Sequence, residues 1–183
     1  MKLFVIFGKA RSGKNTVATL LKENLTKYNY KPCIMHITEP LYSYARNYFN
    51  WDETKDEKPR AFLQKMGIDI IEKNLSKKHF LLHRLKEDIE ILNNFFNIFI
   101  ITDARLQKEL DYFKKTYTEV VTIKIERKAY DNNLTKEQKN HITEKEVDTL
   151  KNFDYIITND SKESLKEQVK NIIENEIKGE YYE

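Results

Sequence analysis

The chain has 183 residues, of which 40% are hydrophobic and 33% charged, and 32 basic and 29 acidic side chains give a net charge of +3. This composition excludes an intrinsically disordered chain, and the interspersed charges argue against nucleic-acid binding, which needs basic residues gathered on one face or arm. The apolar runs are too short to cross a membrane, and we expect no signal segment before the first of them. The single Cys33 excludes a disulfide framework, so we expect one cytoplasmic domain over residues 1–183.

The beginning of the chain predicts a strand that leads into a glycine-rich loop. An apolar run at Leu3–Phe7 ends at Gly8, and Gly13 and Lys14 open a stretch with helical spacing over Asn15–Tyr28. In such a loop, backbone N–H groups and the helix N-terminus surround a polyphosphate, and the lysine reaches its outer phosphates. Two of the chain's four glycines occupy the two loop positions, which favours phosphate binding over an ordinary turn.

A second strand and a helical region follow. The strand is predicted at Cys33–Ile37, and amphipathic helices over Pro40–Phe49, Arg60–Leu75 and His79–Phe96. Gly67 lies inside the second of these helices, where glycine costs about 1 kcal/mol relative to alanine. It indicates a break in the helix, or the close approach of a ligand or of another backbone.

The rest of the chain alternates between strands and helices. Strands are predicted over Asn97–Thr102, Val120–Ile125 and Tyr155–Thr158, and helices from Arg105 to about Tyr117, over Thr143–Asn152 and from Ser161 to about Lys178. The first of these strands is the most apolar and is expected at the centre. Five strands alternating with helices predict an α/β fold with a five-stranded parallel sheet covered by helices on both faces.

Residues suited to ligand binding follow each predicted strand: Gly8, Thr38, Asp103, Arg127 and Asn159. The carboxyl ends of parallel strands meet at one edge of the sheet, where ligands bind. Asp103 can hold Mg²⁺ there, cap the following helix, or do both. Five arginines near this edge offer planar donors for phosphate oxygens: Arg11, Arg46, Arg60, Arg105 and Arg127.

A polar segment over residues 127–142 is too long for a tight turn. Phosphoryl transfer requires positioning, a metal ion and positive charge, and it gains from the exclusion of water. We interpret the segment as a lid over the site, with an ordinary surface loop as the alternative.

Four segments together resemble the P-loop nucleoside monophosphate kinases, most closely the phage-type deoxynucleoside monophosphate kinase family. They are Gly8–Thr16, Arg60–Gly67, Ile101–Arg105 with Glu109, and His141–Glu144 with Asp154–Asp160. The common phosphate motif G-x-x-x-x-G-K-[ST] has a hydroxyl directly after the lysine, where this chain has Asn15. The resembled kinases have Gly-Lys-x-Thr instead, which accounts for Thr16.

The resemblance implies an ATP site with magnesium. It implies that Gly13, Lys14 and Thr16 bind the ATP phosphates and magnesium. With the rest of the loop, the predicted ATP contacts are Gly8, Arg11, Ser12, Gly13, Lys14, Asn15 and Thr16, and the predicted Mg²⁺ ligands are Thr16 and Asp103. The residues predicted to act in catalysis are Lys14, Asp103, Arg105 and Arg127. The resemblance implies that Asp103 and Arg105 lie beside the acceptor phosphate and that Arg127 belongs to the lid.

The acceptor is expected in the helical region of residues 38–96. The resemblance implies that Arg60 and Gln64 line its pocket, and Gly67 is a further candidate contact. Such kinases often have Pro-Leu-Lys after the second strand, whereas this chain has Tyr42 at the lysine position. A basic contact is therefore missing or moved to Arg46. We predict that Tyr42 or its neighbour Tyr44 faces the sugar.

The leading hypothesis is an ATP-dependent kinase that transfers the γ-phosphoryl group to a nucleoside monophosphate, by resemblance a deoxy one, to give the diphosphate. The alternatives are a related kinase for phosphomevalonate or dephospho-coenzyme A, and a non-catalytic nucleotide-binding protein. The expected partners are small-molecule nucleotides rather than nucleic acid or membrane. The resemblance also raises a homodimer as one possibility.

Overall fold

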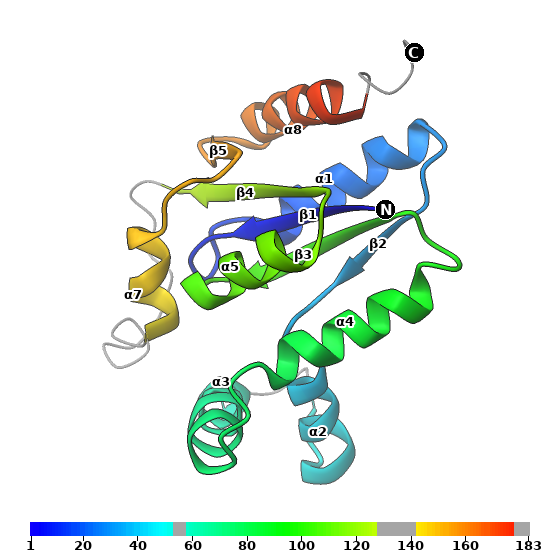
Figure 1. Ribbon diagram of the computed structural model, residues 1–183. Helices are drawn as coiled ribbons and strands as arrows, with labels where there is room; N and C mark the ends of the chain where they lie inside the picture. The colour runs from blue at the N-terminus through cyan, green and yellow to red at the C-terminus, as the bar shows by residue number, and fades with distance from the viewer. Residues whose placement is uncertain (53–57, 128–141, 178–183) are drawn as a thin grey trace. The chain divides into compact units, whose positions relative to one another are not determined.

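A computed structural model describes residues 1–52, 58–127 and 142–177 (Figure 1). The chain forms two compact units, Met1–Met35 with Leu92–Glu183, and His36–Ile91. We call them the sheet unit and the helical unit. The helical unit includes most of the region 38–96 that the sequence predicts to be helical, and the assignment of this region to the acceptor stays a prediction.

The sheet unit is built on five parallel strands in the order β2-β3-β1-β4-β5. The strands are β1 Lys2–Phe7, β2 Pro32–Met35, β3 Ile98–Ala104, β4 Val120–Glu126 and β5 Tyr155–Thr158. The predicted parallel sheet is confirmed. The middle strand is β1, not β3 as predicted. The ends of three strands also differ from the prediction: β2 stops at Met35, β3 continues through Asp103 to Ala104, and β4 continues to Glu126.

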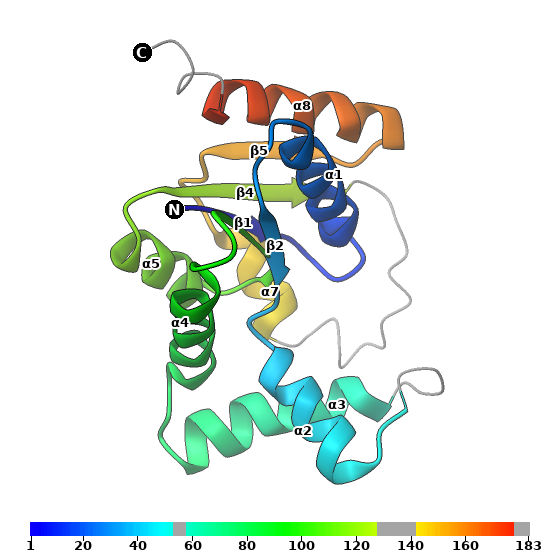
Figure 2. The same ribbon diagram turned by 90° about the vertical axis from the view of Figure 1, so that its right-hand side faces the viewer.

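Helices cover both faces of this sheet, as predicted. Helices α1 Lys14–Lys27 and α8 Lys162–Ile177 lie side by side on one face, and α5 Gln107–Thr116 lies on the other (Figures 1 and 2). Every residue of Leu3–Phe7 is fully buried, because helices cover β1 on both faces. This burial accounts for the continuous apolar run in the sequence. A short helix, α7 Ile142–Thr149, precedes β5.

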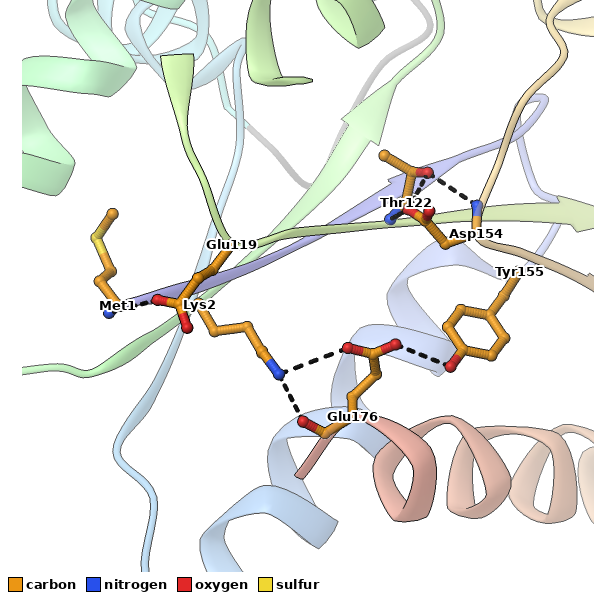
Figure 3. A network of polar contacts seen from close by, with 7 residues as sticks. All are labelled: Met1, Lys2, Glu119, Thr122, Asp154, Tyr155 and Glu176. Atoms are coloured by element: carbon orange, nitrogen blue, oxygen red, sulfur yellow. Dashed lines mark hydrogen bonds and ion pairs between the residues drawn. The ribbon is translucent and has the colours of Figure 1, made fainter. Parts of the chain in front are cut away.

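Polar side chains join the amino ends of the strands to the end of α8 (Figure 3). Lys2 donates to the carbonyl oxygen of Glu176 at 2.5 Å, and the Tyr155 hydroxyl donates to the Glu176 carboxylate at 2.9 Å. Asp154 Oδ2 accepts from the backbone N–H and the hydroxyl of the fully buried Thr122, at 2.7 and 2.6 Å. These contacts hold β1, β4 and β5 together at the edge where the strands begin.

The helical unit contains α2 Glu39–Phe49, α3 Lys58–Gln64, the π-helix η1 Lys65–Asn74 and most of α4 Phe80–Leu92. The helix predicted over Arg60–Leu75 thus changes from α to π at Lys65. Gly67 is buried in η1, and an added Cβ would lie 3.2 Å from Leu41 Cδ1 of α2. Close packing of two helices therefore gives this glycine a structural reason.

Candidate functional site

The glycine loop, residues Gly8–Gly13, joins β1 to α1. The Ser12 N–H donates to the Lys9 carbonyl oxygen at 3.2 Å and closes a tight turn in which Arg11 is left-handed, with φ 59°. Non-glycine residues adopt this conformation at an energetic cost, and such residues are concentrated at ligand sites. The loop therefore has the local geometry of a binding element.

Both predicted loop glycines are required by close contacts. A Cβ added at Gly8 would lie 2.7 Å from Ser12 Oγ and 3.0 Å from the Ile125 carbonyl oxygen. A Cβ added at Gly13 would lie 2.4 Å from Asn159 Nδ2, and Gly13 itself has φ 109°, which side chains rarely allow. The loop backbone is thus pressed against the ends of β4 and β5.

Lys14 places its positive charge inside this loop. Its side-chain ammonium donates to the carbonyl oxygens of Gly8 and Lys9 at 2.7 and 2.6 Å, and the residue is only 7% exposed. Lysine is almost never buried unless its charge is paired or used. Among the described residues the buried Ser12 hydroxyl finds no hydrogen-bond partner, so the loop also holds an unused donor.

Asn15 and Thr16 lie on the first turn of α1, and both are exposed. The positive end of the helix dipole at this turn favours an anion. The seven residues predicted to bind the ATP phosphates thus lie in one continuous segment, the glycine loop and the first turn of α1.

Asp103 lies at a bulge beside the end of β1. Val5 pairs with Ile101 and Phe7 with Ala104, so β3 contains one more residue than β1 between these pairs. Bulges redirect side chains and are frequent next to active sites. Strands β1 and β3 adjoin at the point where the strand order reverses, which is where α/β sheets bind ligands. The half-buried Asp103 and the glycine loop therefore share one end of two adjacent strands.

Arg105 lies in the short connection between β3 and α5, not on the helix as predicted, since α5 begins at Gln107. The expectation that Asp103 caps this helix was also wrong: the N-cap residue is Leu106. Glu109 reaches back instead, and its Oε2 accepts from the backbone N–H groups of Arg105 and Leu106 at 2.6 and 2.9 Å.

Burial raises the pKa of Glu109 to about 7; the two backbone hydrogen bonds oppose this shift, and the nearby charge of Asp103 adds to it. Glu109 belongs to a motif that the sequence singles out, but nothing in the sequence indicates that its carboxylate turns inward.

Arg127 and Asn159 contact the loop from the ends of β4 and β5. Arg127 Nη1 donates to the Arg11 carbonyl oxygen at 3.2 Å, and Asn159 Nδ2 donates to the Ser12 carbonyl oxygen at 2.8 Å. Arg127 is the only residue of the predicted lid before Ile142 that belongs to the described part of the chain, and residues 128–141 lie outside it. Asn159 was predicted at the edge of the sheet but not as a loop contact.

Two acidic residues of α7 contact the same region. Asp148 forms an ion pair with Lys9 of the loop at 2.7 Å, and Glu146 Oε1 accepts from the Gln107 N–H at the start of α5 at 2.6 Å. No motif marks either residue in the sequence, so sequence reasoning missed both. Helix α7 is therefore linked to the loop and to the helix that follows β3.

The predicted acceptor residues lie in the helical unit. The Tyr42 ring lies 5.5 Å from the Trp51 ring between centroids, and Arg46 forms an ion pair with Glu39. Gln64 is half-buried at the end of α3, whereas the side chain of Arg60 lies outside the described parts. Tyr42 and Trp51 pack around a small apolar core formed by Leu41, Ala45, Leu63 and Ile71.

Comparison with known families identifies the chain. The family model described as deoxynucleotide monophosphate kinase matches residues 47–170, about two thirds of the sequence. The chain belongs to the deoxynucleotide monophosphate kinase family. It is therefore a kinase, a phosphotransferase. The matched segment includes Asp103, Arg105, Arg127 and Asn159, and it begins after the glycine loop.

Solved structures support the fold of this kinase. APS kinase of Mycobacterium tuberculosis in complex with AMPPNP and APS has a TM-score of 0.53 at 16% identity, with 94% of this chain and 95% of that chain covered. A cysteine-to-alanine mutant of the same enzyme has a TM-score of 0.52 at 16% identity, with 94% of each chain covered. Shikimate kinase from Aquifex aeolicus has a TM-score of 0.45 at 17% identity, with 98% of each chain covered. A comparison with curated proteins found no match. The two APS kinase structures confirm the P-loop kinase fold.

The two predicted magnesium ligands, Thr16 and Asp103, are of a chemical type that suits this ion. Thr16 and Asp103 offer a hydroxyl and a carboxylate, and Mg²⁺ prefers oxygen ligands, commonly one or two protein groups together with substrate phosphates and water. The described residues contain no cluster of three or more His, Cys, Asp or Glu side chains arranged to hold a metal by themselves. In the same parts of the chain, no helix is both long and apolar enough to span a bilayer.

Proposed function

We propose that this kinase transfers the γ-phosphoryl group of ATP to a deoxynucleoside monophosphate, giving ADP and the deoxynucleoside diphosphate. The observation that carries the proposal is the Lys14 ammonium, enclosed by the glycine loop at the end of β1, next to the strand β3 that contains Asp103 near its own end. Membership of the deoxynucleotide monophosphate kinase family supports the choice of acceptor.

The loop and α1 bind the ATP phosphates in this proposal. Backbone N–H groups around Gly13 and the first turn of α1 face the phosphate oxygens, and the Ser12 hydroxyl gains an acceptor. Lys14 exchanges the carbonyl oxygens of Gly8 and Lys9 for oxygens of the outer phosphates. Thr16 and Asp103 would hold Mg²⁺, which supplies charge neutralisation on the phosphates when it is bound.

Arginine side chains stabilise the transferring group. Arg127 is already held near the loop by its hydrogen bond to the Arg11 carbonyl oxygen, and Arg105 follows the end of β3. Guanidinium groups bind phosphate oxygens with two parallel hydrogen bonds, which fixes orientation as well as charge. We assign both to the phosphoryl group, with Arg105 also contacting the acceptor phosphate and Arg11 contacting ATP.

Acceptor contacts are proposed in the helical unit: Tyr42, Arg46, Arg60, Gln64 and Gly67. Tyr42 is the candidate for the sugar, because it is only half-buried and its ring is braced by Trp51. Arg46 has to release Glu39 before it can contact a phosphate. Glu39 therefore competes with the acceptor phosphate for the Arg46 side chain.

The decisive experiment measures ADP formation with each deoxynucleoside and ribonucleoside monophosphate, and with phosphomevalonate and dephospho-coenzyme A. We expect turnover with at least one deoxynucleoside monophosphate and a loss of about 10²-fold or more in kcat in Lys14→Ala. Lys22→Ala is the matched control, because Lys22 is an exposed lysine on the same helix. Lys14-dependent turnover with the other acceptors alone would refute the proposed substrate.

A further inference from the structure

Glu109 is a buried carboxylate that the proposed chemistry does not use. It lies on the first turn of α5 with 9% exposure, and its Oε2 accepts from Arg105 N at 2.6 Å and Leu106 N at 2.9 Å. The N-cap residue Leu106 has no side-chain acceptor to offer these groups. Glu109 thus binds both N–H groups of the connection between β3 and α5.

These two bonds fix the backbone on either side of Arg105. The connection has only two residues, Arg105 and Leu106, and the N–H of Arg105 belongs to the peptide bond that ends β3. The same strand end contains the bulge at which Asp103 lies, where the ladder with β1 is interrupted. A carboxylate that orients these peptide groups therefore sets the direction in which the Arg105 side chain leaves the backbone.

Helix capping alone does not require this arrangement. A neutral Ser, Thr or Asn at position 106 would cap α5 with its own side chain, without the desolvation cost that a buried carboxylate bears. Glu109, the third residue of α5, also accepts from the N–H of Arg105, which lies before the helix and is not one of its capped groups. We infer that Glu109 is a positioning residue that holds Asp103 and Arg105 in the geometry required at the phosphates. The inference rests on the proposed function of those two residues.

The test compares Glu109→Gln, Glu109→Ala and Leu110→Ala at a temperature where circular dichroism shows all three folded. Glutamine keeps an oxygen that accepts both bonds, alanine removes them, and Leu110→Ala weakens the packing of the same helix without touching the connection. We expect kcat to fall about 10²-fold in Glu109→Ala, because a displacement of reacting groups by about 1 Å can have an effect of this size. The KM for ATP should change little. Glu109→Gln and Leu110→Ala should both stay within about 3-fold of wild-type kcat.

Amide hydrogen exchange supplies a readout that does not depend on turnover. The amides of Arg105 and Leu106 should lose protection in Glu109→Ala and keep it in Glu109→Gln. Unchanged protection in Glu109→Ala, or the same kcat in Glu109→Ala and Leu110→Ala, would overturn the inference, as would a fall in Glu109→Gln equal to that in Glu109→Ala. A wild-type protein that turns over no nucleoside monophosphate refutes the proposed function instead, and the exchange data still test Glu109.

Discussion

The side-chain amide of Asn159 donates a hydrogen bond to the carbonyl oxygen of Ser12 and packs against Gly13. Its backbone N–H donates to the Glu126 carbonyl oxygen at 2.8 Å, which fixes it at the ends of both β4 and β5. Asn159 therefore ties the glycine loop to the ends of these two strands, beside the hydrogen bond from Arg127 to Arg11. This contact and the fit of Gly13 beneath it lead to the first two predictions.

Asn159→Ala should weaken ATP binding. The substitution removes one hydrogen bond, worth about 1 kcal/mol, from the loop that binds the phosphates, so the Kd for ATP should rise by about 5-fold. Isothermal titration of ATP into the purified variants measures the effect. Asn171→Ala, an exposed asparagine on α8, serves as the control and should leave the Kd unchanged. Equal affinities in all three proteins would show that the contact does not shape the loop.

Gly13→Ala should abolish measurable ATP binding, because the new Cβ meets Asn159 Nδ2 at 2.4 Å on a backbone with φ 109°. Removing the Asn159 side chain relieves the collision but not the backbone strain. The double variant Gly13→Ala with Asn159→Ala should therefore recover part of the binding. A double-mutant cycle on ATP affinity and on unfolding free energy gives the coupling. Strictly additive effects would contradict the close contact.

Asp154→Ala should destabilise the fold without altering catalysis. It leaves the buried Thr122 N–H without its acceptor, and an unsatisfied buried donor costs about 1–3 kcal/mol. Asp148→Ala breaks only an ion pair whose side chains are 40% and 58% exposed, which is worth less than about 1 kcal/mol. Urea unfolding measures both. A larger loss in Asp148→Ala than in Asp154→Ala would reverse the expected ranking.

The stability of the protein should contain a component that falls as the pH rises from about 4.5 to about 7. Burial raises the pKa of Glu109 from 4.5 to about 7, so in this window the folded protein binds more protons than the unfolded chain. The shift corresponds to about 3 kcal/mol at most. Unfolding free energies at pH 5 and pH 8 should show this decrease in wild type relative to Glu109→Gln. Parallel pH profiles in the two proteins would exclude it.

The sequence predicts the architecture well because its strongest signals are local. The apolar run of β1, the two loop glycines and the alternation of strands with helices each depend on neighbouring residues. The structure confirms these features. The cap of α8 is equally local, because the Ser161 hydroxyl accepts from the Ser164 N–H, three residues further on, at 3.0 Å.

Features that depend on partners distant in the sequence could not be predicted. The contact of Asn159 with Ser12 joins residues 147 positions apart, and that of Glu146 with Gln107 joins residues 39 apart. The extension of β3 through Asp103 depends on its pairing with β1. The π-helix at Lys65–Asn74 was not predicted, because its 10 residues form too few turns for the apolar pattern to distinguish a π-helix from an α-helix.

The Lys14 ammonium, bound to two carbonyl oxygens of its own loop, also bears on the energetics of ATP binding. A side chain that folding has already confined loses little further entropy when a phosphate replaces those carbonyl oxygens. Part of the cost of assembling the site is therefore met during folding. The affinity for ATP then depends mainly on how much better a charged phosphate satisfies the lysine than two neutral carbonyl groups do.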